Sequence, residues 1–140
     1  MSKISRKLQA KIRHQEKNRC GYCLLPQNLY PTLLDIEHIQ PTTKGGSDEE
    51  KNLWLACREY NSHKSAKTYG FDEKTGQRLK LFNPRRQNWN RHFKFSEDKT
   101  EIIGKTACGR ATVEALKLNI EILVSVRQLW IEFDLFPPKD

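Results

Sequence analysis

The sequence predicts an α+β fold, because helical and strand-like patterns occupy different parts of the 140-residue chain. Apolar residues recur at helical spacing over 3–19 and 109–133, near the two ends. Short branched-apolar runs bounded by Gly and Pro lie between them, at 33–39 and 52–57. A chain of this length favours one domain with its own apolar core.

The composition is basic, with 25 Lys and Arg against 17 Asp and Glu, a formal net charge of +8. This balance favours a polyanionic partner. Apolar runs are far shorter than the roughly 20 residues that cross a bilayer, which excludes a membrane protein. The first 19 residues lack the apolar centre of a secretory signal. We therefore expect a cytoplasmic protein whose four cysteines are thiols or metal ligands rather than disulfides.

The first predicted element is a helix over 3–19 with a narrow apolar stripe of Ile4, Leu8 and Ile12. Its basic face is either solvated surface or a phosphate contact. A tight turn follows at 20–23, where Gly21 can take a left-handed conformation.

The middle of the chain predicts a strand, a long loop, a second strand and a helix. The strand covers 33–39, and Pro41 with the Gly-rich run 44–47 ends it. Residues 52–57 indicate a second short strand or the start of a helix, and 58–67 a short helix.

The second half predicts less regular structure. Residues 71–91 are expected to be mostly loop with a turn at 74–76. Alternation over 92–104 predicts a β-hairpin, and 109–133 predicts the longest helix. Arg127 falls near the apolar stripe of that helix, and the sequence does not explain it.

Three cysteines have the spacing of a zinc site. Cys20 and Cys23 flank a turn, as the paired thiolates of a tetrahedral zinc site do, and Cys57 begins a second pair. Tyr60 stands where the fourth thiol is expected, and a phenol is a poor zinc ligand at neutral pH. Either the zinc is absent and Tyr60 packs beside buried thiols, or another side chain completes the site. The candidates for that fourth ligand are His14, His63 and Cys108.

A further set of residues follows in fixed order between and after these cysteines. The set is Glu37-His38, Pro41, Gly45-Gly46, Asn52-Leu53, Cys57, Asn61 and Lys64. Over residues 20–64 this order resembles the HNH (ββα-metal) endonuclease family. Residues 80–116 are more faintly similar to the tail of a small bacterial HNH subgroup.

The resemblance implies a fold and an activity. A ββα-metal core would cover 20–69, preceded by the basic helix of 1–19. An accessory hairpin and a long helix within 70–140 would pack on that core. The implied activity is metal-dependent hydrolysis of DNA phosphodiester bonds, leaving a 5′-phosphate and a 3′-hydroxyl. Nothing in the sequence resembles a base-reading recognition helix, so we expect weak sequence preference.

The resemblance also implies the catalytic roles. A histidine can take a proton near neutral pH, so His38 would be the general base that activates water. Glu37 would bind the metal with Asn61 on the helix, and His63 is the second choice. Oxygen ligands suit Mg²⁺ or Mn²⁺, and Ni²⁺ is also possible. Adjacent strand residues face opposite sides, so Glu37 and His38 can cooperate only where the strand ends or bends.

Asn52 would belong to the catalytic group by hydrogen-bonding the loop backbone, which ties the segment after His38 to the second strand. DNA phosphates would contact Lys44, Lys64 and Lys67.

Two other function classes fit parts of the sequence. The departure at Tyr60 favours a non-catalytic, zinc-stabilised nucleic-acid-binding module on the same scaffold. The Cys20-Gly-Tyr-Cys23 motif could also serve a thiol redox protein, although it follows a basic helix rather than a strand of a βαβ unit.

Overall fold

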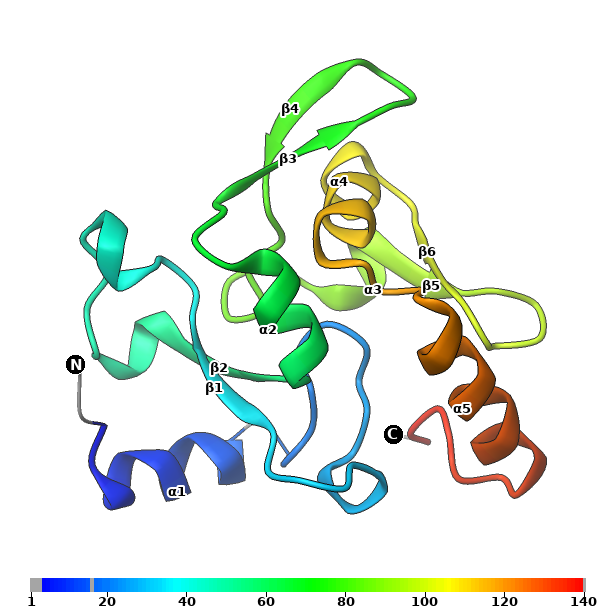
Figure 1. The fold of residues 1–140 in the computed structure, drawn as a ribbon, viewed down its shortest axis with the longest axis horizontal. Helices are drawn as coiled ribbons and strands as arrows, with labels where there is room; N and C mark the ends of the chain where they lie inside the picture. The colour runs from blue at the N-terminus through cyan, green and yellow to red at the C-terminus, as the bar shows by residue number, and fades with distance from the viewer. Residues whose placement is uncertain (1–3, 16, 140) are drawn as a thin grey trace. The chain divides into compact units, whose positions relative to one another are not determined.

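A computed structural model of the chain describes residues 4–15 and 17–139 (Figure 1). The chain divides into two compact units, the first ending at Thr68 and the second beginning at Tyr69. Within the described residues, the strands form three two-stranded antiparallel sheets accompanied by helices, which confirms the α+β class. None of the helices in this part of the chain has the length and apolar character needed to span a bilayer.

The first unit is built around one antiparallel strand pair and the helix that follows it. Strand β1 pairs with β2 from Asp35 opposite Ala56 to His38 opposite Leu53. Helix α1 packs on β2 and α2 packs on β1. Its elements are α1 (Arg6–Gln15), η1 (Gln27–Leu29), β1 (Asp35–His38), η2 (Thr42–Lys44), η3 (Glu50–Asn52), β2 (Leu53–Ala56) and α2 (Arg58–Lys64).

Helix α1 is shorter than the predicted helix over 3–19. It ends at Gln15, and Lys17 and Asn18 have φ values of 53° and 54°, which a right-handed helix cannot accommodate. Residues 3 and 16 of the predicted helix lie outside the described residues. The predicted role of Gly21 was wrong, because the left-handed residue at this turn is Leu24, with φ 64°.

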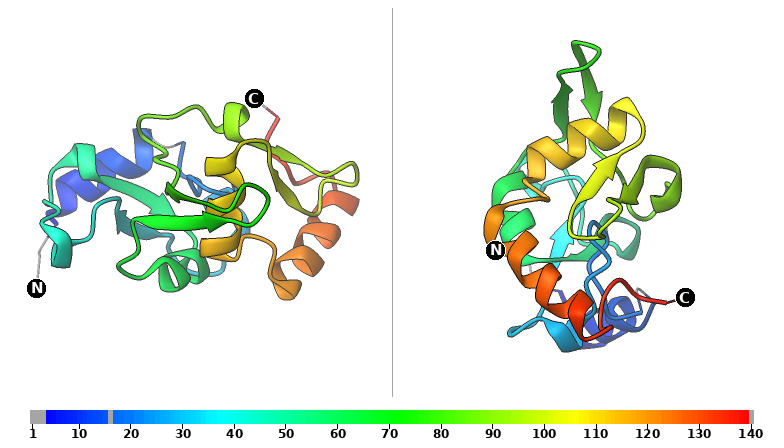
Figure 2. Two further views of the ribbon diagram at one scale, coloured as in Figure 1. Left: turned by 90° about the horizontal axis from the view of Figure 1, so that it is seen from above. Right: turned by 90° about the vertical axis from the view of Figure 1, so that its right-hand side faces the viewer.

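The second unit contains two hairpins and two longer helices. Helix α4 packs on β3, β4 and β6 (Figure 2). The elements are β3 (Tyr69–Asp72), β4 (Gln77–Lys80), α3 (Trp89–His92), β5 (Phe93–Phe95), β6 (Ile102–Gly104), α4 (Ala107–Leu116) and α5 (Glu121–Glu132). The hairpin predicted over 92–104 is confirmed by the pairing of β5 with β6.

One prediction for this unit was incomplete and another was wrong. Residues 71–91 are mostly loop and contain the predicted turn at 74–76, but β3 and β4 form a hairpin around that turn, which the sequence did not predict. The prediction of a single helix over 109–133 was wrong, and the segment forms two helices, since α4 ends at Leu116 and the next residue, Lys117, has a left-handed conformation. Arg127 of α5 is buried and donates to the carbonyl oxygens of Thr100 and Leu118, so this cation holds the connection between the helices.

Candidate active site

The three predicted thiols meet in the interior of the first unit. The sulfur atoms of Cys20, Cys23 and Cys57 all lie within 4.8 Å of one another. The backbone N–H groups of Tyr22 and Cys57 point at the Cys20 sulfur, at 3.3 and 3.5 Å. Such N–H donors stabilise thiolates, and three converging sulfur atoms could hold a metal such as zinc.

The surroundings of the cluster favour protonated, neutral thiols when no metal is bound. Burial raises the pKa of Cys20 well above its usual range, and hydrogen bonds from neighbouring thiols together with burial do the same for the pKa of Cys57. A bound cation would reverse this preference, because zinc binds thiolates. Tyr60 is fully buried, and among the described residues this potential metal cluster contains neither His14 nor His63. The Cys108 thiol belongs to the second unit and donates to the carbonyl of Lys80.

His38 is the last residue of β1, and its side chain lies on the opposite face from Glu37. Its Nε2 lies 2.7 Å from Oδ1 of Asp48, which comes from the loop before η3. A carboxylate only accepts hydrogen bonds, so Nε2 carries the proton in the neutral ring and Nδ1 holds the lone pair. Within the described residues, no hydrogen bond engages that Nδ1.

The loop that brings Asp48 to His38 is fixed by Asn52. The Asn52 amide accepts from the Gln40 N–H at 2.7 Å and donates to the carbonyl oxygens of Gln40 and Ser47 at 3.0 and 2.7 Å. These are the backbone hydrogen bonds that the sequence predicts for this side chain. Gly46 completes the loop, because a Cβ there would lie 1.7 Å from the Gln40 carbonyl oxygen.

Glu37 occupies the inner face of β1 and is 2% exposed. Its Oε1 accepts from the Tyr22 hydroxyl at 2.6 Å and pairs with Lys64 Nζ at 2.9 Å. Burial raises the pKa of this carboxyl, although the Lys64 ammonium opposes that shift. Glu37 Oε2 is buried and has no hydrogen-bond donor among the described residues. One carboxylate oxygen therefore remains available to a cation.

Lys64 does not have the position expected of a phosphate contact. Its ammonium is buried and donates to Glu37 and to the carbonyl oxygens of His38 and Ile39, both at 3.0 Å. The sequence-based assignment of Lys64 to DNA contact does not fit this interior position. Lys44 and Lys67, the other two predicted contacts, are exposed.

The other predicted metal ligands lie on α2. Asn61 Nδ2 donates to Oδ2 of Asp35 at 3.2 Å, which leaves the amide oxygen as an acceptor. His63 is exposed. Among the described residues, no hydrogen bond or ion pair joins Glu37 to Asn61 or His63.

A hollow of about 340 Å³ lies beside His38. Arg13 of α1 and Arg58 of α2 line it together with Asp35. Arg13 donates to the Leu34 carbonyl, and Arg58 Nε lies 3.7 Å from Asp35 Oδ1. The two guanidinium groups give the hollow the chemistry of a phosphate site next to an imidazole.

Comparison with protein families identifies the segment that carries this arrangement. Residues 20–67 match the HNH endonuclease family. This match confirms the resemblance, and it includes all three thiols, His38, Asn52 and α2. No curated protein and no solved structure matches the chain.

Two residues near His38, Asp48 and Arg13, were not predicted from the sequence. Asp48 lies in a run of acids, so nothing in the sequence alone singled it out as the partner of His38. Arg13 precedes the HNH segment, and the sequence does not distinguish it from the other cations of α1.

Proposed function

We propose that the HNH segment hydrolyses phosphodiester bonds of DNA, with His38 as the general base. The carrying observation is the orientation of His38, whose Nε2 is held by Asp48 while Nδ1 has no partner among the described residues. The ring borders a hollow that also contains Arg13 and Arg58. We further propose that 20–69 is the catalytic core, and that 1–19 and 70–140 are accessory to it.

In the proposed reaction, His38 Nδ1 takes a proton from water as the water oxygen attacks phosphorus. Asp48 stabilises the resulting imidazolium through the Nε2 hydrogen bond. Arg13 and Arg58 hold the phosphate and offset the charge that develops on its oxygens. The bond from phosphorus to the 3′ oxygen breaks, which leaves a 5′-phosphate and, after protonation by solvent, a 3′-hydroxyl.

The chemistry of the donor set fits a divalent cation. Glu37 Oε2 is a buried carboxylate oxygen without a donor among the described residues, and the Asn61 amide oxygen can still accept while its nitrogen binds Asp35. Glu37 and Asn61 would hold Mg²⁺ or Mn²⁺, and the His63 imidazole would suit a softer ion such as Ni²⁺. A bound ion would stabilise the departing alkoxide. Zinc, in turn, would occupy the three thiols as a structural ion.

DNA contact is proposed for the exposed cations near the site. Lys44 precedes Gly45 in the loop, and Lys67 follows α2. Both are exposed and can reach phosphates, in contrast to the buried Lys64. Contacts of this kind carry no base code, so we expect weak sequence preference.

The test is nicking of supercoiled plasmid by the purified chain in Mg²⁺, Mn²⁺ or Ni²⁺. His38→Ala should abolish nicking, whereas His14→Ala, which replaces an exposed histidine of α1, should cut like the wild type. Circular dichroism of both variants checks that they fold. Equal nicking by His38→Ala and wild type would overturn the assignment of the base.

One observation favours a second function, a nucleic-acid-binding module without cleavage. The Lys64 ammonium already neutralises Glu37, which reduces the need for a cation at that carboxylate. Such a module would shift DNA in a gel and leave it intact in each of the three metal ions, and it would still contain zinc.

A further inference from the structure

The β3–β4 hairpin of the second unit presents one face made of aromatic and basic side chains. Tyr69 lies opposite Lys80 and Phe71 lies opposite Arg78. Residues directly opposite each other in an antiparallel pair project from the same face, as do residues two apart on one strand. We call these four residues the hairpin face.

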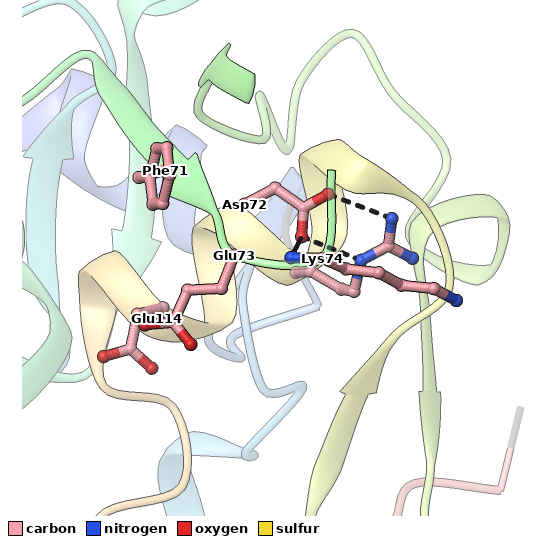
Figure 3. Close-up of a pocket in the computed structure, with 6 residues that line it drawn as sticks. Phe71, Asp72, Glu73, Lys74 and Glu114 are labelled. Carbon is pink, nitrogen blue, oxygen red and sulfur yellow. Dashed lines mark hydrogen bonds and ion pairs between the residues drawn. The ribbon is translucent and has the colours of Figure 1, made fainter. Parts of the chain in front are cut away.

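The other side of the hairpin is held against α4. A Cβ on Gly70 would lie 2.8 Å from the Ala111 carbonyl oxygen, so the backbone of β3 approaches the helix directly. Asp72 is 1% exposed and accepts two hydrogen bonds from Arg110, at 2.9 and 3.1 Å. Figure 3 shows this carboxylate joined to the guanidinium by dashed lines. These contacts fix which side of the hairpin faces outward.

Both aromatic rings of the hairpin face are exposed. Tyr69 is 42% exposed and Phe71 is 54% exposed. The Arg78 guanidinium lies 4.2 Å from the centre of the Tyr69 ring, in a cation–π contact. Packing within the unit therefore leaves about half of the Phe71 side chain open to solvent, and the exposed Arg78 side chain lies over the Tyr69 ring.

The charge of the hairpin face selects the kind of partner. Its two charged members, Arg78 and Lys80, are both cations, and both are exposed. Asp72, which follows Phe71 directly along the chain, is already paired with Arg110. The exposed acids Glu73 and Glu114 line a hollow with Phe71 (Figure 3) but are not members of the hairpin face. Open rings beside cations complement a polymer that alternates flat apolar groups with negative charges.

We propose that the hairpin face binds single-stranded nucleic acid, with bases stacked on Phe71 and Tyr69 and phosphates at Arg78 and Lys80. Unpaired bases expose the ring faces that such stacking needs, whereas a duplex offers only its phosphates to this face. The proposal deepens the proposed function by adding a strand-binding surface outside the HNH segment. The hairpin-face proposal rests on the proposed DNA hydrolysis only for its choice of nucleic acid as the polyanion.

The test measures binding of fluorescein-labelled oligo(dT) and of the same strand annealed to oligo(dA). The protein is the full chain carrying His38→Ala, in EDTA, so that cleavage does not interfere. Phe71→Ala and Tyr69→Ala should each weaken binding of oligo(dT) by about tenfold. Phe133→Ala is the matched control, because Phe133 is a 69% exposed ring on the second unit, and it should bind like the parent.

The remaining outcomes separate the alternatives. Unchanged oligo(dT) binding by Phe71→Ala and Tyr69→Ala would overturn the proposal. Equal losses for single strand and duplex would overturn it as well, because they indicate phosphate contact without stacking. Displacement of oligo(dT) by polyglutamate as readily as by unlabelled oligo(dT) would indicate an acidic protein partner instead. Plasmid nicking by Phe71→Ala with His38 intact reports on the proposed cleavage separately.

Discussion

The Lys64 ammonium of α2 lies 2.9 Å from Oε1 of Glu37 on β1, and both side chains are at most 3% exposed. The same nitrogen donates to the carbonyl oxygens of His38 and Ile39. One buried cation thus joins the helix to the end of the strand from which His38 projects. The position of the proposed base therefore depends on an ion pair in the interior.

Lys64→Met should destabilise the protein by about 3–5 kcal/mol, because it leaves the Glu37 carboxylate buried without its cation. Lys67→Met, a change of the same chemistry at an exposed position, should change stability by less than about 0.5 kcal/mol. Urea unfolding followed by circular dichroism measures both. Adding Glu37→Gln to Lys64→Met should restore part of the loss. Equal stability of the two single variants would contradict this role for Lys64.

The two glycines of the loop after Pro41 should differ in their response to alanine. Gly45 has φ 83°, and an added methyl group would meet no atom within 4 Å, so Gly45→Ala should cost about 1 kcal/mol from backbone strain alone. Gly46→Ala should cost about 3 kcal/mol or more, because the added methyl meets the Gln40 carbonyl oxygen. Thermal unfolding of both variants measures the difference, and a reversed order would show that the loop can move away from Gln40.

Motif spacing located the centre of the first unit well. The predicted strands over 33–39 and 52–57 contain β1 and β2, and the helix over 58–67 contains α2. Asn52 could be assigned to loop hydrogen bonding because an amide both donates and accepts. The burial of Lys64 was not predictable, since a lysine in a basic segment gives no sign of a buried carboxylate partner.

The second unit was harder to predict for a physical reason. In β3 the inward positions are Gly70 and Asp72 and the aromatic residues face outward, so the strand lacks the apolar inward face that a sequence pattern would indicate. The break between α4 and α5 occurs at Lys117, a residue that carries no glycine or proline signal. Arg127 falls on an apolar stripe because its acceptors are the backbone carbonyl oxygens of Thr100 and Leu118 and the amide oxygen of Asn119, and the sequence does not reveal these contacts.

The Asp72–Arg110 pair should make stability depend on pH in the acid range. Hydrogen bonds from Arg110 and Thr75 hold the pKa of Asp72 well below its usual value of 3.8. The stabilisation is complete above that unfolded-state value and is lost as the pH falls toward the lower folded-state pKa. The deficit of Asp72→Asn relative to wild type should therefore be full at about pH 6 and shrink below about pH 4 in urea unfolding. Glu73→Gln serves as the exposed control and should show a much smaller deficit. A deficit that persists undiminished in acid would exclude the ion pair as its source.

Replacing Tyr60 should change zinc binding in a predictable direction. Tyr60→Cys supplies a fourth thiol at the spacing expected of a second zinc-binding pair, and it should slow the release of zinc to a chelator by about tenfold or more. Tyr60→Phe keeps the buried ring without adding a ligand, so its zinc content and release rate should match the wild type. Metal analysis after dialysis against EDTA and a colorimetric release assay measure both. Faster release from Tyr60→Cys would show that the three thiols cannot accommodate a ligand at position 60.

Asp48 should act on cleavage only through His38. Asp48→Ala removes the carboxylate that holds Nε2, so kcat for plasmid nicking should fall about tenfold or more, with little change in KM. Glu49→Ala removes the neighbouring exposed acid and should leave kcat unchanged. The decisive measurement is the double variant, because residues that act as one unit are not additive. Asp48→Ala should have no further effect on the residual activity of His38→Ala, and a second tenfold loss in that background would assign Asp48 a role of its own.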